Sequence, residues 1–188
     1  MRKFIYLAMF FVCFAFLYLV AFSSYVEAGV APAAVDCSGT GICDDGDRID
    51  CPGGGADCFG TDGADKICGS ATGESIFAGK GNDQVCAGGG IDVIHGGFGD
   101  DQINGEGGDD TIQGGWGDDN MVGGDGDDTI LAGRCDDTVD GSETGEAVGD
   151  TCLGGLGDDS FTASSCELPV AGGDLGQQTA DDHANCSL

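Results

Sequence analysis

A nine-residue repeat constrains this chain more than any other feature, because it leaves little room for helices or long strands. The repeat runs without a gap over residues 42–140 as eleven units, and after a four-residue interruption at 141–144 two further units occupy 145–162. Clear examples are GGFGDDQIN (96–104) and GGWGDDNMV (114–122). A period this regular predicts a solenoid, in which each unit packs only against its neighbours.

Two positions of the unit support its interpretation as one turn-and-strand element of a solenoid. The sixth is acidic in every unit but one, where Ala56 stands, and the eighth is always apolar. Glycine at positions one, two and four leaves three positions for an extended segment, so each unit predicts a short strand followed by a six-residue turn. Stacked strands would then place the eighth residues in one inward apolar ladder. These residues are Ile49, Cys58, Ile67, Ile76, Val85, Ile94, Ile103, Ile112, Met121, Ile130, Val139, Cys152 and Phe161.

The pattern GGxGxDxUx resembles the hemolysin-type calcium-binding repeat of secreted bacterial RTX proteins. The resemblance covers units five to eleven and unit thirteen well, and the earlier units more loosely. It implies an all-β fold, a right-handed parallel β-roll with two units in each coil. It also implies that calcium ions lie between the turns of units two apart. Such repeats usually accompany a catalytic, toxin or adhesin domain, for which this chain has no room, so we expect a freestanding module.

The residue types agree with calcium binding. Calcium prefers six to eight oxygen ligands, which glycine-rich turns supply as exposed carbonyls and the following aspartate as a carboxylate. Without a cation, stacked turns would align rows of carboxylates that repel each other. Calcium is therefore expected to be a folding partner as well as a ligand. The alternative is a solvated acidic repeat without ions, which the regular placement of acid after glycine disfavours.

Pairing the strong units two apart predicts five calcium sites, between the units that begin at residues 78 and 96, 87 and 105, 96 and 114, 105 and 123, and 114 and 132. The expected carboxylate ligands are Asp83, Asp92, Asp101, Asp110, Asp119, Asp128 and Asp137. The expected glycine ligands are Gly96, Gly97, Gly99, Gly105, Gly107, Gly114, Gly115, Gly117, Gly123, Gly124 and Gly126.

The first four units lack the paired glycines, so we expect them to form a cap. An EF-hand at 44–50 is excluded, because Gly46 and Arg48 stand where oxygen ligands are needed. The predicted divisions are a cysteine-rich cap with degenerate repeats at 29–59, a β-roll at 60–140 and interrupted terminal repeats at 141–162. A cysteine-containing tail follows at 163–188.

The N-terminus predicts export. Arg2 and Lys3 precede an apolar run over 4–22, and small residues at 26 and 28 suit cleavage after Ala28, so residues 1–28 are interpreted as a signal peptide. The run is nearly long enough to span a bilayer, so an uncleaved anchor is the alternative. Both interpretations place the rest of the chain outside the cytoplasm, secreted, at the cell surface or in the periplasm.

Charge and cysteine content fit an exported protein. The chain after residue 28 has 4 basic and 33 acidic residues, a formal charge of −29. Nucleic acid and anionic membranes are therefore poor partners. Ten cysteines remain after the signal segment, and an even number in an exported, loop-rich chain favours disulfides. No CxxC pair occurs, so a zinc or redox site is disfavoured.

One disulfide can be predicted by position. Cys68 and Cys86 both stand at position nine, eighteen residues apart, so a two-unit coil places them on neighbouring strands, and we expect them to be bonded. The sequence does not give the other pairings, and free cysteines are the alternative. The remaining cysteines are expected to staple the two ends, Cys37, Cys43, Cys51 and Cys58 at the first and Cys135, Cys152, Cys166 and Cys186 at the second.

The chain has no usual hydrolase motif, and after the signal segment its only histidines are His95 and His183, so we expect a protein that is not an enzyme. His95 stands at an outward position. Phe98 and Trp116 at position three predict turn packing, with a sugar or protein contact as the alternative. The sequence thus predicts an extracellular calcium-binding protein. Its competitor is a calcium-stiffened adhesion or matrix module that binds polysaccharide or protein.

Overall fold

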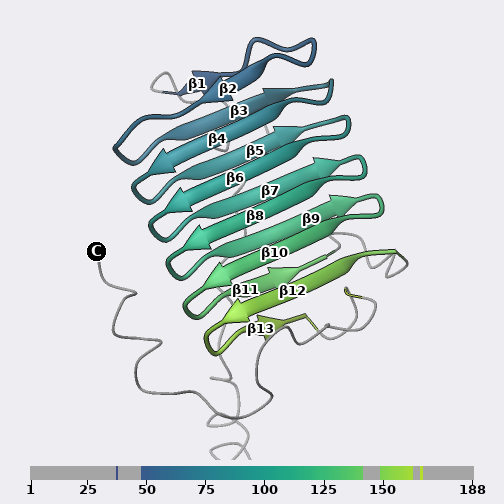
Figure 1. Cartoon of the computed structure of the whole chain (residues 1–188). Helices are drawn as coiled ribbons and strands as arrows, with labels where there is room; N and C mark the ends of the chain where they lie inside the picture. The colour runs from purple at the N-terminus through teal and green to yellow at the C-terminus, as the bar shows by residue number, and fades with distance from the viewer. Residues whose placement is uncertain (1–36, 38–47, 142–148, 163–165, 167–188) are drawn as a thin grey trace, which may run out of the picture. The chain divides into compact units, whose positions relative to one another are not determined.

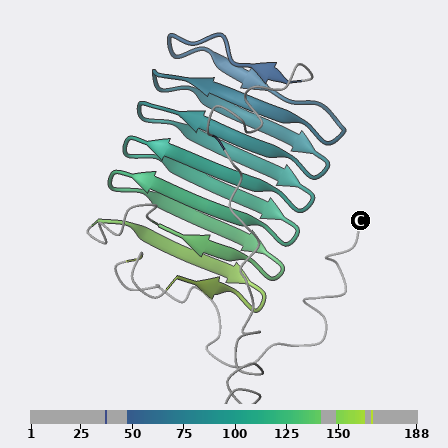
Figure 2. The same cartoon turned by 180° about the vertical axis from the view of Figure 1, so that it is seen from behind.

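The computed structural model describes residues 37, 48–141, 149–162 and 166 of the chain. Within these residues the protein is all β, with thirteen strands, and no helix there is long and apolar enough to cross a membrane. The strands form two parallel sheets, which Figures 1 and 2 show from opposite sides. The predicted signal segment, 1–28, lies outside the described residues, as does most of the predicted tail.

Strands alternate strictly between the two sheets along the chain. The seven-stranded sheet consists of β1 (Ile49–Asp50), β3 (Lys66–Ser70), β5 (Gln84–Gly88), β7 (Gln102–Gly107), β9 (Asn120–Asp125), β11 (Thr138–Asp140) and β13 (Ser160–Phe161). The six-stranded sheet consists of β2 (Asp57–Phe59), β4 (Ser75–Lys80), β6 (Val93–Phe98), β8 (Thr111–Trp116), β10 (Thr129–Arg134) and β12 (Thr151–Leu156).

Each coil contains two units, as the repeat predicts, because every strand pairs with the strand two places along the chain. Ile76 is opposite Ile94 and Ile94 opposite Ile112, a constant offset of eighteen residues. Across the interruption the offset is twenty-two, since Ile130 is opposite Cys152. The four additional residues therefore leave the inward positions in register, which matters because a slip of one residue would reverse every side chain.

The central strands are longer than the three residues that the pattern predicts. In β6, for example, pairing continues from Val93 through the glycines to Phe98. The reason is that glycine can pair while adopting a positive φ, as Gly97 does at 118° opposite Gly115. The turns between the sheets are therefore short, and each one ends at the position-six acid.

The core consists of the eighth-position side chains, as predicted, but in two facing rows rather than one. Eleven of these thirteen side chains are buried, while Ile49 and Phe161 at the ends are partly buried and pack against them. Four position-one residues, Cys51, Ala78, Ala87 and Ala132, are also buried in the core. With so narrow a core, no single coil buries enough apolar surface to fold alone.

The predicted Cys68–Cys86 disulfide is wrong. These residues do lie opposite each other on β3 and β5, so the coil period behind the prediction is confirmed. However, side chains of paired parallel strands point the same way, which keeps their Cβ atoms about 4.8 Å apart, beyond the usual disulfide range of about 3.5–4.5 Å. Cys86 is bonded instead to Cys37, and Cys68 is bonded elsewhere.

Two other disulfides hold the ends of the described solenoid. Cys51 is bonded to Cys58 before the first long strands, and Cys152 is bonded to Cys166 after the interruption. Cys135 is also disulfide-bonded. Two of the predicted end-stapling cysteines, 43 and 186, lie outside the described residues.

Candidate metal centre

The acids of position six form two rows, one along each edge where the chain passes between sheets. The row at the turns from the six-stranded to the seven-stranded sheet contains Asp65, Asp83, Asp101, Asp119, Asp137 and Asp159. The row at the opposite turns contains Glu74, Asp92, Asp110, Asp128 and Asp150. All seven predicted carboxylate ligands thus lie in these rows, each one coil from the next.

One oxygen of each aspartate from Asp83 onward holds the preceding coil in place. The backbone N–H of Asp83 donates to Oδ1 of Asp101 at 2.9 Å, and that of Asp101 donates to Oδ1 of Asp119 at 2.9 Å. The second row repeats the contact, with the N–H of Asp92 and Oδ1 of Asp110 2.8 Å apart. Each carboxylate therefore joins two coils through a charge-assisted hydrogen bond.

The second oxygen of eight of these aspartates is buried and has no hydrogen-bond partner. Burying a carboxylate oxygen without a partner costs free energy, because the oxygen has lost its hydrogen bonds to water and has made no others in their place. Eight such atoms recur at equivalent positions and are available to a cation. The eight residues are Asp83, Asp92, Asp101, Asp110, Asp119, Asp128, Asp137 and Asp150.

The first glycine of the unit leaves space beside this oxygen. A Cβ on Gly96 would lie 2.4 Å from Oδ2 of Asp101 and 2.7 Å from the carbonyl oxygen of Gly114 in the next coil. Gly105 stands in the same relation to Asp110 and to the carbonyl of Gly123. Carboxylate and carbonyl oxygens therefore converge where a side chain is missing, and this holds for the position-one glycines 96, 105, 114 and 123.

The glycines of positions two and four allow adjacent coils to approach through their backbones. Gly115 and Gly117 have φ near 126° and 129°, and a Cβ on either would lie within about 2.3 Å of a carbonyl oxygen of the preceding coil. Among the predicted glycine ligands, Gly107 differs: it lies at position three, and a Cβ there would meet no atom within 4 Å. Gly108, which was not predicted, holds position four, with φ 132°.

Burial raises the pKa of the row aspartates from Asp83 onward. The pKa is about 7 for Asp101, about 8 for Asp137 and about 9 for Asp119, against an ordinary value of 3.8. Loss of water is the largest cause, and neighbouring carboxylates add to it, while the backbone hydrogen bond partly opposes it. The folded rows are thus unfavourable as bare anions at neutral pH.

The first units satisfy their acids differently. Thr61 donates to Oδ2 of Asp65 through its backbone N–H at 2.6 Å and through its hydroxyl at 2.9 Å. Ser70 likewise donates to Glu74 through its hydroxyl and, at 3.1 Å, through its N–H. Desolvation by burial raises the pKa of Glu74, but these hydrogen bonds outweigh it and leave that pKa lowered. Here a hydroxyl side chain stands at position two, where the later units have mainly glycine.

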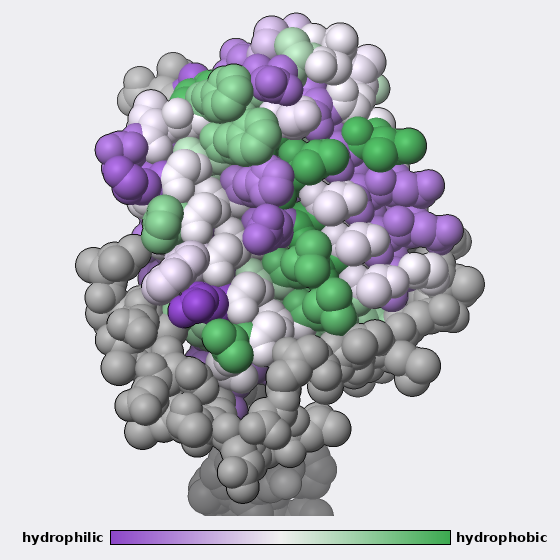
Figure 3. All heavy atoms as spheres, in the orientation of Figure 1, coloured by the Kyte–Doolittle hydropathy of each residue, from purple (hydrophilic) through white to green (hydrophobic). Residues whose placement is uncertain are grey.

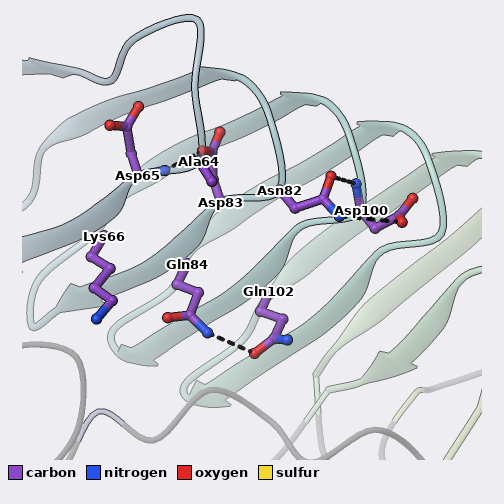
Figure 4. Close-up of a pocket in the computed structure, with 8 residues that line it drawn as sticks. All are labelled: Ala64, Asp65, Lys66, Asn82, Asp83, Gln84, Asp100 and Gln102. Carbon is purple, nitrogen blue, oxygen red and sulfur yellow. Dashed lines mark hydrogen bonds between the residues drawn. The ribbon is translucent and has the colours of Figure 1, made fainter. Parts of the chain in front are cut away.

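Outside the buried rows, the turns carry polar side chains that also repeat by coil. A surface hollow of about 360 Å³ lies at the start of the first row, lined by Asp65, Asp83 and Asp100 among others, whose side chains are drawn in Figure 4. Beside it, the amide of Gln84 donates to Gln102 at 3.4 Å. The backbone N–H of Asp100 donates to Oδ1 of Asn82 at 3.1 Å. These exposed ladders brace neighbouring turns.

The buried rows fit a cation that accepts many carbonyl ligands. No three His, Cys, Asp or Glu side chains converge within the described part of the chain, so carboxylates alone cannot complete a coordination shell there. Calcium takes carboxylates and backbone carbonyls together, whereas zinc favours nitrogen and sulfur. The orphaned oxygens, the nearby carbonyls and the absent Cβ atoms therefore suit calcium.

Two acids beyond the predicted ligand set continue the rows. Asp150 accepts the N–H of Asp128 at 2.9 Å, and Asp159 accepts that of Asp137 at 3.1 Å, both across the interruption. The Oδ2 of Asp150 is buried without a partner, like those of the central aspartates. Both residues stand at position six of the repeat, so a pairing of units that skips the four-residue insertion would have found them.

The aromatic residues singled out in the sequence pack against their own neighbours. Trp116 lies between Phe98, whose ring centroid is 5.9 Å away, and Arg134, whose guanidinium is 4.3 Å from the Trp116 centroid. His95 stacks on Phe77 at 5.0 Å and contacts Gln113 at 3.0 Å through Nδ1. These contacts place His95 on the outer surface, away from the acid rows.

Comparison with protein families identifies the repeat region. Residues 59–94, 87–121 and 113–143 match the family described as RTX calcium-binding nonapeptide repeat (4 copies). No curated protein and no solved structure was found to match the chain. The solenoid at 59–143 therefore consists of repeats of this calcium-binding family, in agreement with the resemblance inferred from the GGxGxD units.

Proposed function

We propose that this chain, whose residues 59–143 are RTX calcium-binding nonapeptide repeats, is an extracellular protein that folds around calcium ions held between adjacent coils. The observation that supports it most strongly is the set of eight buried aspartate oxygens without a partner. Calcium at these atoms would supply the missing interaction and neutralise the rows. The exterior supplies calcium at concentrations that cytoplasm does not, and the disulfides suit the same compartment.

The ligands in this proposal come from units two apart. Between the coils that contain Asp101 and Asp119, the carboxylate Oδ2 atoms and the glycine carbonyls of both turns would surround one ion. The same arrangement gives the five sites predicted from the sequence, and Asp150 and Asp159 extend the rows past the interruption. The units with Thr61 and Ser70 would hold no ion, because hydroxyls already occupy their acids.

The test is a calcium titration of the oxidised protein, purified after export, followed by circular dichroism and by calorimetry, with magnesium as the control. We expect a cooperative gain of β signal and binding of several calcium ions per chain, while magnesium at equal concentration produces little of either because it demands a tighter octahedral site. Absence of calcium binding, or an equal response to magnesium, would contradict the proposal.

A second candidate is a calcium-stiffened adhesion or matrix module. It is favoured by Phe98, which is 41% exposed on the outer face of the six-stranded sheet. Trp116 is less suited to sugar stacking, because Phe98 and Arg134 occupy its two sides. Binding of the calcium-loaded protein to cell-surface glycans, lost in both Phe98→Ala and Trp116→Ala, would support this candidate. In neither candidate is the protein an enzyme.

A further inference from the structure

The two sheets present different outer faces. Every large hydrophobic side chain that the described residues expose belongs to the six-stranded sheet or to the turn that leads into it. We call the outer surface of β4, β6, β8, β10 and β12 the apolar face, and Figure 3 shows apolar side chains on this view of the molecule. Its exposed hydrophobic residues are Phe77, Val93, Phe98, Leu131 and Leu156, and Phe59 on β2 and Ile91 in the turn before β6 are exposed as well.

The apolar face also lacks acids, in a chain that contains 34 of them. Each of its five strands points three side chains outward, and none of these fifteen residues is Asp or Glu. Its cations are already engaged, since Lys80 pairs with Asp62 at 2.9 Å and Arg134 lies over Trp116. The face is therefore close to neutral between two strongly acidic edges.

We propose that the apolar face binds the same face of a second copy of this chain, which makes the calcium-loaded protein a symmetric dimer. A contact between identical patches satisfies two-fold symmetry without any further surface. A basic partner would be drawn to the acidic edges instead, because that is where the negative potential lies. Among the described residues, the strands of the seven-stranded sheet carry Glu106, Asp125 and Asp140, so two copies bring fewer carboxylates together through the apolar face.

The size of the face predicts a weak dimer. Five strands at a spacing of about 4.8 Å, each with six residues that rise about 3.3 Å, cover roughly 500 Å². Two copies would bury about 1,000 Å², which lies near the lower limit for a specific interface. We therefore expect a dissociation constant on the order of 10–100 µM. Salt should strengthen the dimer, since it screens the repulsion between two acidic chains.

Sedimentation of the oxidised, calcium-loaded protein from about 1 to 300 µM tests the proposal. We expect a monomer–dimer equilibrium that tightens when sodium chloride rises from about 0.1 to 0.5 M. Leu131→Asp, in the middle of β10 on the apolar face, should raise the dissociation constant at least tenfold. Gln102→Asp adds the same charge on the seven-stranded sheet and should change it by less than twofold. Circular dichroism establishes that both variants stay folded.

Three results would overturn the proposal. A protein that stays monomeric at about 300 µM has another use for the face, such as a polysaccharide or a different protein. A dimer that Leu131→Asp and Gln102→Asp weaken equally does not use this face. A dimer that dissociates as salt rises is held by calcium bridges between acidic edges rather than by apolar contact.

Discussion

The first coil and the central coils use one repeat but satisfy its buried acid in two ways. Units three and four, here called the first coil because they carry the first position-six acids that the structure describes, contain Thr61 and Ser70, which donate hydroxyl hydrogen bonds to Asp65 and Glu74. In the central coils, glycine stands at position two in most units, and the second oxygen of Asp101 and its equivalents has no partner. The difference teaches that the acids of the solenoid's end are satisfied by its own side chains, whereas the middle leaves buried oxygens that the proposed calcium ions would satisfy.

The comparison also explains the distribution of disulfides. Cys51–Cys58 and Cys37–Cys86 act on the first coils, and Cys152–Cys166 acts after the interruption. Such ends have fewer neighbours than a central coil and gain most from a covalent constraint on the unfolded chain. Between them, the buried carboxylates repeat with little variation.

The largest effect expected is that of pH on the calcium-free protein. The pKa is raised to about 6 for Asp92, about 7 for Asp101 and about 9 for Asp119, so the folded state binds more protons than the unfolded state above about pH 4. Stability must therefore fall as the pH rises through this window. After calcium is removed, we expect β structure at pH 5 and its loss from the central coils by pH 8, as measured by circular dichroism.

Calcium reverses this pH dependence, because it competes with protons for the same oxygens. The apparent calcium affinity should increase at least tenfold between pH 5.5 and 7.5. A calcium-free protein whose thermal midpoint rises over this range would show that the buried aspartates are not protonated in the fold.

The two disulfides of the first coils should differ in how much they stabilise the fold, because they close loops of different length. Loss of Cys37–Cys86, which spans 49 residues, should lower the free energy of unfolding by about 4 kcal/mol, and loss of Cys51–Cys58, which spans 7, by about 2 kcal/mol. Paired alanine substitutions measured by urea unfolding in calcium would check this order. An equal loss from both would indicate that loop closure is not what these bonds contribute.

A single central carboxylate should control folding by calcium. Asp119→Asn removes the charge while it preserves the shape, so the calcium concentration at half-folding should rise at least tenfold. In chelator the same variant should be more structured than the parent, since it buries no charge. Asp118→Asn is the matched control, because its side chain is exposed, and it should shift the midpoint by less than twofold. Identical behaviour of the two variants would exclude Asp119 as a ligand.

The smallest effect expected is the loss of a hydroxyl in the first coil. Ser70→Ala leaves Glu74 buried with fewer donors and should lower the free energy of unfolding by about 1–3 kcal/mol, equally with and without excess calcium. Ser75→Ala, on the outer side of β4, is the control and should change it by less than about 0.5 kcal/mol. A loss that disappears in calcium would mean that Glu74 also binds an ion.

Much of this architecture could be predicted, because a strict period determines it. The position-eight core, the eighteen-residue coil and the rows that contain Asp101 and Asp110 follow from one aligned repeat. The Cys68–Cys86 prediction failed because side chains that point the same way from paired parallel strands keep their Cβ atoms about 4.8 Å apart, and Cys86 is bonded instead to Cys37, which lies outside the repeat. Gly108 keeps the usual glycine of position four, with φ 132°, and could have been predicted from the same alignment, whereas the predicted Gly107 is an additional glycine at position three.

The surface was the least predictable part. Positions seven, nine and three are unconstrained by the repeat, and only the alternation of units between two sheets reveals that Phe77, Leu131 and Leu156 share one face. The hydroxyl contacts of the first coil were equally hidden. Nothing in the spacing of Thr61 and Asp65 distinguishes a hydrogen-bonded turn from an ion-binding one until the side chains are placed.

Amide hydrogen exchange with and without calcium tests the central claim most directly. The backbone N–H groups of Asp101 and Asp119 donate to the buried row, whereas those of Thr61 and Ser70 donate within the first coil. We expect calcium to protect the first pair at least a hundredfold, and the second pair to be protected in chelator as well. If the N–H groups of Asp101 and Asp119 were protected as strongly in chelator as in calcium, this result would contradict the claim that the central coils need calcium to fold.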